Sequence, residues 1–416
     1  MRILLFTGKG GVGKSTVSAG TGALLAERGL RTLVVSTDTA HSLGDAFGVR
    51  VGADPVQVTE TLWVQHVDAQ RRFEESWLEI QTYLLDVMTV AGVDPVAAEE
   101  LTVLPGAEEV LALLELRRQA ASGDYDAIVV DCAPTAETLR LLSLPEALTW
   151  YMDRVFPPQR RVMRTFGPLL GKAVGMPMPG DGVFAAVERL HGELSEVRAL
   201  LTGPETTVRL VMTPEQVVLA EARRAWTTLS MHGYRVDAVV VNRVFPAVDA
   251  DAVGAPADWL RGWVQAQNEV LAEAEESFAP VRLWRSGYRD GEPRGVEALR
   301  DVAAALHGDA DPLAEGPGVG SLHVEVTENG ATMTLPVPLA TRADTSLARR
   351  GGDLVVQCGT YRRVLSLPAI LARMKVTGAS VADGTLRVQF VRDPDPGGPS
   401  DGPEGDDHPN HHEERA

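Results

Sequence analysis

The sequence has 416 residues, 44% of them hydrophobic, which is enough for about two to three domains with apolar cores and excludes a disordered or fibrous protein. Its formal net charge of -18 disfavours nucleic acid and anionic membranes as partners. Two cysteines, Cys132 and Cys358, are too few for a disulfide framework or a four-thiolate zinc site, and the sequence shows no signal-peptide pattern and no membrane-spanning apolar stretch. We therefore expect a cytoplasmic protein without zinc.

The first predicted strand, residues 2–7, leads into a glycine-rich loop and then into a helical pattern over residues 15–28 that Gly29 closes. The loop reads GKGGVGKST and fits the phosphate-binding pattern G-x-x-x-x-G-K-[ST] in its required strand–loop–helix context. In this pattern backbone N–H groups face the phosphates, Lys14 reaches the β- and γ-phosphates, and Ser15 ligates Mg²⁺. The predicted nucleotide-binding residues of the loop are Gly8, Lys9, Gly10, Gly11, Val12, Gly13, Lys14, Ser15 and Thr16.

Further apolar runs alternate with helical patterns along the chain. They are strands predicted at residues 31–36, 125–131, 206–212, 234–242 and 279–284. Apolar runs without alternation are typical of parallel strands buried on both faces. We therefore predict an α/β fold of the P-loop NTPase class, with a mostly parallel sheet, spanning residues 1–307. Helical insertions are expected at about residues 62–116 and 145–201.

The remaining chain has a different composition. Residues 308–321 are rich in glycine, proline and acids, which predicts a linker. Residues 322–392 show short strands and hairpin turns, which predict a small all-β sandwich. Residues 393–416 are acidic and nearly devoid of apolar side chains, so we expect a disordered tail.

Three more segments follow predicted strands: STDTAHSLGD at 36–45, DCAPTAETLR at 131–140 and MTPEQVVLAEARR at 212–224. Together with the phosphate loop they resemble the family of arsenical pump-driving (ArsA) and tail-anchored-protein targeting (Get) ATPases, and residues 291–299 are similar to the segment that closes over the base in that family. Residues 322–392 resemble the small heat-shock (α-crystallin) domain that is fused to some bacterial members.

The resemblance implies an ATPase that uses ATP and Mg²⁺ and acts as a homodimer. Asp38 then orients the attacking water, a task suited to a carboxylate near the γ-phosphate. Asp131 holds Mg²⁺ through water, Asn242 contacts adenine, and Glu215 contacts the nucleotide across the dimer. Lys9 reaches the nucleotide of the facing subunit, as an arginine finger does. The catalytic residues implied are Asp38, Lys9 and Lys14.

Departures from the family pattern leave alternatives open. Thr39 replaces a proline of the first switch, and Cys132, Ala136 and Glu137 replace Thr, Gly and His of the second. A nucleotide-bound holdase or scaffold without turnover is therefore a second hypothesis. An arsenite efflux subunit is less favoured because arsenic requires thiolates. A partitioning-type ATPase is less favoured because the tail supplies neither a basic face nor an amphipathic helix.

Methionines gather at residues 152–184 with several phenylalanines and leucines. Such a segment is either ordinary core or an adaptable groove for a hydrophobic protein client. The sequence does not distinguish these two interpretations.

Overall fold

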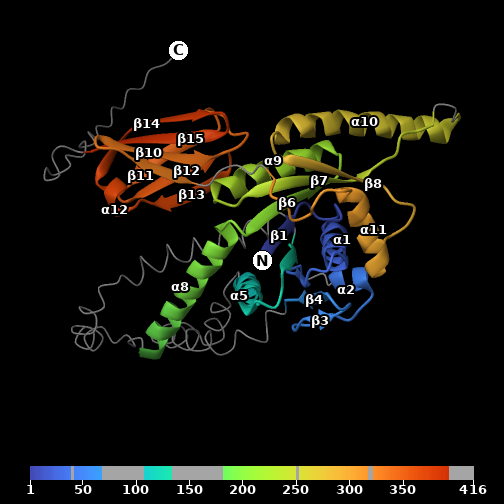
Figure 1. Cartoon of the computed structure of the whole chain (residues 1–416). Coiled ribbons are helices and arrows are strands. Elements are labelled where there is room, and N and C mark those ends of the chain that lie inside the picture. Colours follow the sequence, from blue (N-terminus) through green and yellow to red (C-terminus); the bar gives the residue numbers. More distant parts are fainter. Residues whose placement is uncertain (39–41, 68–106, 134–180, 250–252, 317–321, 393–416) are drawn as a thin grey trace, which may run out of the picture.

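The computed structural model describes residues 1–38, 42–67, 107–133, 181–249, 253–316 and 322–392 (Figure 1). Of the sequence predictions, the acidic tail, most of the methionine-rich segment and residues Thr39, Ala136 and Glu137 lie outside these ranges. The described chain forms a large α/β body and a smaller antiparallel β-sandwich beside it (Figure 1).

The α/β body is built on one sheet with the order β3-β4-β2-β5-β1-β6-β7-β8. Its strands are β1 (Arg2–Thr7), β2 (Thr32–Ser36), β3 (Val56–Gln57), β4 (Leu62–His66), β5 (Ala127–Asp131), β6 (Thr206–Met212), β7 (Val236–Val244) and β8 (Arg282–Gly287). Every pairing is parallel except that of β3 with β4. The apolar runs predicted as strands form β1, β2, β5, β6, β7 and β8, so the predicted α/β fold class is confirmed.

Helices cover both faces of this sheet. They are α1 (Lys14–Glu27), α2 (Ser42–Phe47), α5 (Ala107–Ser122), α8 (Asp181–Thr202), α9 (Gln216–Met231), α10 (Ala255–Phe278) and α11 (Gly295–His307). Right-handed crossovers place α1 on one face, where it packs against α2 and α11, and place α5, α8, α9 and α10 on the other (Figure 1). The central strands are therefore buried on both sides, which explains their near-continuous apolar sequence.

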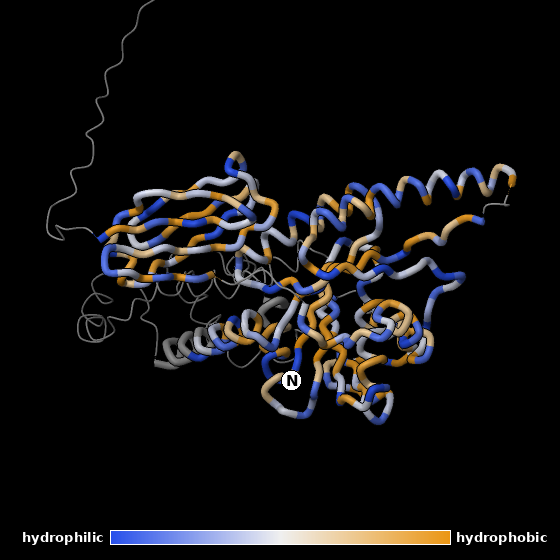
Figure 2. The backbone as a smooth tube through the Cα atoms, turned by 45° about the horizontal axis from the view of Figure 1, so that its top comes forward, coloured by the Kyte–Doolittle hydropathy of each residue, from blue (hydrophilic) through white to orange (hydrophobic). Residues whose placement is uncertain are grey.

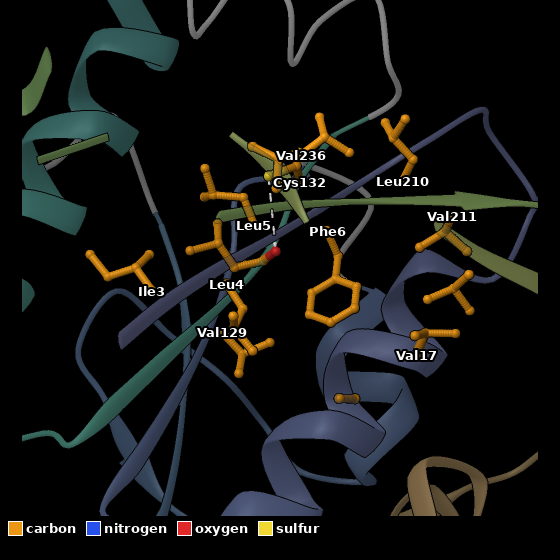
Figure 3. Packing of buried hydrophobic residues seen from close by; sticks show 14 of the residues in the cluster. Ile3, Leu4, Leu5, Phe6, Val17, Val129, Cys132, Leu210, Val211 and Val236 are labelled. Carbon is orange, nitrogen blue, oxygen red and sulfur yellow. Dashed lines mark hydrogen bonds between the residues drawn. The ribbon is translucent and has the colours of Figure 1, made fainter. Parts of the chain in front are cut away.

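The centre of the core lies around β1. Ile3, Leu4, Leu5 and Phe6 are almost completely buried and pack against side chains of the neighbouring strands and α1 (Figure 3). The backbone N–H of Cys132, just after β5, donates to the carbonyl of Phe6 at 3.0 Å. This bond extends the pairing of β1 and β5 to the point where the phosphate loop leaves the sheet.

One predicted boundary was wrong at its start. Residues 62–66, LWVQH, were assigned to a helical insertion but form the parallel strand β4. Gln65 is fully buried there, and its side-chain amide donates to the Ala53 carbonyl and to Glu115 Oε1, both at 2.6 Å. A buried polar side chain with such partners does not show in an apolar pattern, so the strand was missed.

The first part of the predicted linker is docked on the α/β body. The Pro312 carbonyl accepts a hydrogen bond from the fully buried Arg209, and the Glu315 carboxylate pairs with Arg2 at 3.2 Å and Arg235 at 3.3 Å. A Cβ at Gly316 would lie 2.3 Å from the Asp237 carbonyl, so only glycine fits. Residues 308–316 therefore lie across the sheet on the side where β1, β6 and β7 begin and are held there by these contacts.

The β-sandwich has a four-stranded sheet, β14-β15-β10-β9, and a three-stranded sheet, β11-β12-β13. Its elements are β9 (His323–Val326), β10 (Gly330–Pro336), β11 (Thr345–Arg350), β12 (Asp353–Cys358), β13 (Tyr361–Ser366), α12 (Ala369–Ala372), β14 (Met374–Ala382) and β15 (Thr385–Arg392). Hydrophobic and hydrophilic residues alternate along these strands, in contrast to the central sheet (Figure 2). The predicted sandwich is confirmed.

Helix α9 joins the two bodies. Met231, the last residue of α9, is fully buried in the core of the β-sandwich, and its carbonyl accepts a hydrogen bond from Arg363 of β13. One turn earlier, the Thr227 hydroxyl donates to the Pro338 carbonyl at 2.5 Å. The sandwich is thus anchored on the helix that follows β6, the strand that packs against Gly8 of the phosphate loop.

Helix α10 extends beyond the body at its amino-terminal end (Figures 1 and 2). Trp259 and Trp263 are 63% and 48% exposed there, and the centroids of their rings lie 6.1 Å apart.

No helix in the described ranges is both long enough and apolar enough to cross a membrane.

Candidate functional site

The phosphate loop leaves β1 at Gly8 and enters α1 at Lys14. Gly11 and Gly13 have φ values of +83° and +92°, in the left-handed region that favours glycine. Gly8 is required for a different reason, because a Cβ there would lie 2.0 Å from the Val211 carbonyl of β6. The glycines of the motif thus allow a tight curl packed directly on the sheet.

Lys14 and Ser15 open helix α1 at the bottom of this loop. The Lys14 side chain is 6% exposed, and its ammonium donates to the Lys9 carbonyl at 3.3 Å. The Ser15 hydroxyl lies 2.9 Å from the hydroxyl of Ser42, the first residue of α2. The loop is therefore tied to the segment that follows β2.

Strand register brings two carboxylates to the same edge of the sheet. Asp131, the last residue of β5, lies opposite Phe6 of β1 and Ser36 of β2. Asp38 follows β2 by two residues, and its N–H donates to the Ser36 hydroxyl at 3.2 Å. Because the carboxyl ends of parallel strands share one edge, both carboxylates lie beside the phosphate loop.

The Asp131 carboxylate is an electrostatically unusual group. Its side chain is completely buried, and both oxygens lack a hydrogen-bond partner among the described residues. The pKa of Asp131 is raised to about 6: burial is the main cause, the Ser15 hydroxyl and the Lys14 ammonium partly offset it, and the Asp38 charge adds to the rise. Ser15 is close enough to act on the charge, yet outside hydrogen-bond geometry.

This arrangement fits Mg²⁺. A buried carboxylate whose two oxygens have no partner among the described residues, close to a hydroxyl, is the hard oxygen donor set that Mg²⁺ takes up, with waters and phosphates completing its shell. In the described ranges no group of three or more His, Cys, Asp or Glu side chains is placed to hold a metal ion. The residues present suit an ion that shares its ligands with a bound phosphate.

A cavity of about 460 Å³ adjoins the loop on the side of Gly13 and Thr16. Asn242 and Arg243 of β7 line it, together with the stretch from Ser286 to Pro293. Asn242 is 7% exposed, and its Nδ2 donates to the Val12 carbonyl at 2.9 Å. The structure therefore brings Asn242 and the start of the 291–299 segment together next to the loop, as a base-binding pocket requires.

Two predicted residues lie apart from this cavity. Glu215 is exposed directly before α9, and its carboxylate accepts a hydrogen bond from the Thr213 hydroxyl at 3.0 Å. The Lys9 side chain is partly exposed at the loop. Neither lines the cavity of its own chain. Both were predicted to reach a nucleotide across a dimer, which a single chain does not test.

Three further residues of the site were not predicted. The Ser42 hydroxyl contacts the Ser15 hydroxyl, and the only sequence feature that could have indicated Ser42 is its place within the segment 36–45, where it begins helix α2. Arg243 has a φ of +59°, which is rare for a residue with a side chain, and it lines the cavity. Tyr288 also lines the cavity, and its ring stacks on the ring of Phe245 with 5.0 Å between the two ring centroids. No sequence pattern marked Arg243 or Tyr288.

Comparison with known proteins agrees with this geometry. The profile of the anion-transporting ATPases (ArsA) matches residues 1–308. The chain belongs to this ATPase family. A second profile, of the HSP20-like domain found in ArsA, matches residues 328–390, so the predicted family resemblance is confirmed for both bodies.

Relatives of this ATPase family match most of the chain, and two of them match nearly all of it. A protein of Chlorobaculum tepidum, provisionally named arsenical pump-driving ATPase, is 36% identical over 396 residues, covering 94% of this chain and 96% of its own. A protein of Aquifex aeolicus with the same kind of name is 32% identical over 395 residues, covering 93% of this chain and 99% of its own. An ATPase ASNA1 homolog of Entamoeba histolytica is 28% identical over 310 residues, covering 70% and 90%.

Proposed function

We propose that this family member is a Mg²⁺-dependent ATPase that cleaves ATP to ADP and phosphate as a homodimer, and that its nucleotide state controls the binding of a hydrophobic protein client. The observation that carries the proposal is the convergence of Lys14, Ser15, Asp38 and Asp131 at one sheet edge, with a cavity of nucleoside size beside them. These groups supply charge neutralisation, metal binding and water orientation in one place.

The chemistry follows from these side chains. The ammonium of Lys14 and the N–H groups of the loop neutralise and hold the β- and γ-phosphates. Asp38 accepts a hydrogen bond from a water and directs its oxygen at the γ-phosphorus; a new P–O bond forms and the bond to the ADP oxygen breaks. The water's proton leaves to a phosphate oxygen or to solvent.

Ser15 and, through water, Asp131 are the groups proposed to hold Mg²⁺. The ion supplies Lewis-acid stabilisation of the charge on the phosphate oxygens. Near neutral pH the Asp131 carboxylate is mostly ionised despite its burial, because its pKa of about 6 lies below that pH. The charge is therefore present when the ion arrives.

Phosphate release from ATP by the full chain tests the ATPase proposal. Lys14→Ala is expected to abolish both binding and turnover, whereas Asp38→Asn is expected to retain ATP and lose turnover by at least about a hundredfold. Asp45→Asn removes an exposed carboxylate from the same region and is the matched control, with turnover unchanged. Wild-type phosphate release equal to that of Lys14→Ala would favour the nucleotide-bound holdase instead.

Mixing two inactive variants tests the homodimer. Lys9→Ala and Asp38→Asn each disable the protein, but a mixed dimer contains one site with its own Asp38 and the partner's Lys9. Statistical mixing then restores about a quarter of wild-type turnover. If Lys9 acts within its own chain, or the protein stays monomeric with ATP, mixing restores nothing and the proposal fails.

The client part of the proposal has separate support. The sequence resembles the tail-anchored-protein targeting ATPases, one relative is named an ATPase ASNA1 homolog, and the HSP20-like sandwich is anchored on α9. We expect the ATP-trapped Asp38→Asn variant to bind a synthetic apolar helix more tightly than the nucleotide-free protein does. Equal affinity in both states would remove nucleotide control.

Two relatives are named arsenical pump-driving ATPases, which raises arsenite as a second candidate substrate for this chain. The two cysteines disfavour it here, because Cys132 lies in the α/β body and Cys358 in the sandwich, both buried. Burial also raises the pKa of both thiols, which disfavours the thiolates that arsenic binds. Arsenite-stimulated turnover would overturn this judgement.

A further inference from the structure

Asn242 makes a contact that base recognition alone does not require. Its side chain is buried at the carboxyl end of β7, and Nδ2 donates to the carbonyl of Val12, inside the phosphate loop, at 2.9 Å. Val12 itself is 2% exposed, so this carbonyl is shielded from water. A buried carbonyl left without a donor is costly, which makes this bond a structural constraint on the loop.

The bond fixes one peptide plane of the loop. The Val12–Gly13 peptide is trans, and a trans peptide directs its C=O and N–H to opposite sides. With the Val12 carbonyl held toward Asn242, the Gly13 N–H must face the other way. In a phosphate loop, N–H groups of this stretch are the donors that hold the phosphates.

The constraint acts where the backbone is otherwise free. Gly11 and Gly13 flank Val12 and both have positive φ, a conformation that glycine reaches readily but does not hold by itself. A Cβ at position 13 would lie 2.3 Å from Asn242 Nδ2, so the amide fills the space beside Gly13. The loop cannot rotate toward β7 without striking Asn242.

We propose that Asn242 is a positioning residue for the phosphate loop, holding the Val12–Gly13 peptide in its phosphate-binding orientation from the wall of the base cavity. This inference rests on the proposed nucleotide site and deepens it. One N–H of Nδ2 is used by the Val12 carbonyl, and the Oδ1 acceptor is left to bind a ligand's amino group. One side chain then links occupation of the cavity to the shape of the loop.

A ligand without a base separates this role from base contact. Inorganic tripolyphosphate with Mg²⁺ occupies a phosphate loop but leaves the cavity empty. If Asn242 acts only on the base, its loss weakens ATP binding and leaves tripolyphosphate binding unchanged. If Asn242 positions the loop, both ligands bind more weakly.

The test measures binding of Mg²⁺ with ATP and of Mg²⁺ with tripolyphosphate to the full chain by calorimetry. Asn242→Leu keeps the branched shape without hydrogen bonds, and Asn242→Ala removes the side chain. We expect each to weaken tripolyphosphate binding by about tenfold. Ser286 lines the same cavity and makes no hydrogen bond to the loop among the described residues, so Ser286→Ala is expected to weaken ATP binding at most and to leave tripolyphosphate binding unchanged.

Amide hydrogen exchange of the ligand-free variants gives a second readout. The loop peptide at residues 8–14 is expected to exchange at least about threefold faster in Asn242→Leu, while peptides of β1 and β6 remain protected and show that the protein is folded. Unchanged tripolyphosphate affinity together with unchanged loop exchange overturns the positioning role and leaves the proposed ATPase intact. Failure of wild-type protein to bind either ligand overturns the proposed function itself.

Discussion

The buried charge of Asp131 leads to a quantitative prediction for the ligand-free protein. The pKa of this carboxyl is about 6 in the folded protein and 3.8 in its ordinary environment. Between these values the folded state binds more protons than the unfolded state, so the free energy of unfolding falls as pH rises through this window. The full difference corresponds to about 3 kcal/mol, at about 1.4 kcal/mol per pKa unit.

Asp131→Asn keeps the shape of the side chain and removes its charge. The difference in free energy of unfolding between variant and wild type is then expected to rise by about 2 kcal/mol from about pH 4 to about pH 7, in favour of the variant. The unpaired amide of the variant costs about 1–3 kcal/mol, but this cost is independent of pH. The pH-dependent part therefore isolates the carboxylate.

Hydrogen exchange followed by mass spectrometry reports this difference within one body of the molecule. Peptides covering β1 and β5 are compared between variant and wild type at each pH, so that the intrinsic pH dependence of exchange cancels. Peptides of β12 in the sandwich are the internal control and should exchange identically. A difference in protection that stays constant from about pH 4 to about pH 7 would refute the reasoning.

Three further predictions concern buried groups away from the nucleotide site. Asp237→Asn leaves the fully buried Arg209 guanidinium without its ionic partner and is expected to lower the free energy of unfolding by about 3–5 kcal/mol in urea titrations, a loss that the added change Arg209→Met largely restores; no loss would contradict the burial of the pair. Burial lowers the pKa of His307 to about 3, so the unfolded state, with the ordinary value of 6.5, binds more protons between these values; stability falls by about 1.4 kcal/mol per unit as pH drops through this window, and urea titrations of His307→Phe should lack this component. Met231→Ala opens a cavity in the sandwich core and is expected to lower the free energy of unfolding of the sandwich by about 2–4 kcal/mol. Amide hydrogen exchange should then be faster than in the wild type in β10 and β13 but not in β1. Exchange at the wild-type rate in β10 and β13 would show that α9 does not anchor the sandwich.

The strands of the central sheet were predictable because each is buried on both faces. Such strands must be apolar at nearly every position, and β6 matches its predicted range of 206–212. Strand β4 was missed because Gln65 and His66, both buried, interrupt its apolar run. Helix α1 was predicted from the helical pattern that follows the phosphate loop and from Gly29, whose φ of +85° suits the end of a helix.

The phosphate loop was predicted from its motif, since glycine and lysine at fixed spacing reflect local backbone geometry. The groups that reach this loop from elsewhere in the chain carried weaker signals. Ser42 and Asn242 are ordinary polar residues in the sequence, and their importance depends on the partners that the fold supplies, Ser15 and the Val12 carbonyl. A contact between residues 12 and 242 has no local pattern by which to predict it.

The sequence by itself determined the family, the α/β fold class, the sandwich and the phosphate loop, because hydrophobic periodicity and turn chemistry are local properties of a chain. Only the tertiary structure decided that Asp131 is buried and that its oxygens have no hydrogen-bond partner within the described part of the chain. It also decided that residues 308–316 dock on the sheet and that Met231 of α9 completes the core of the sandwich. Burial and partnership arise when distant segments pack together, and a buried charge or an interdomain contact is defined by that packing alone.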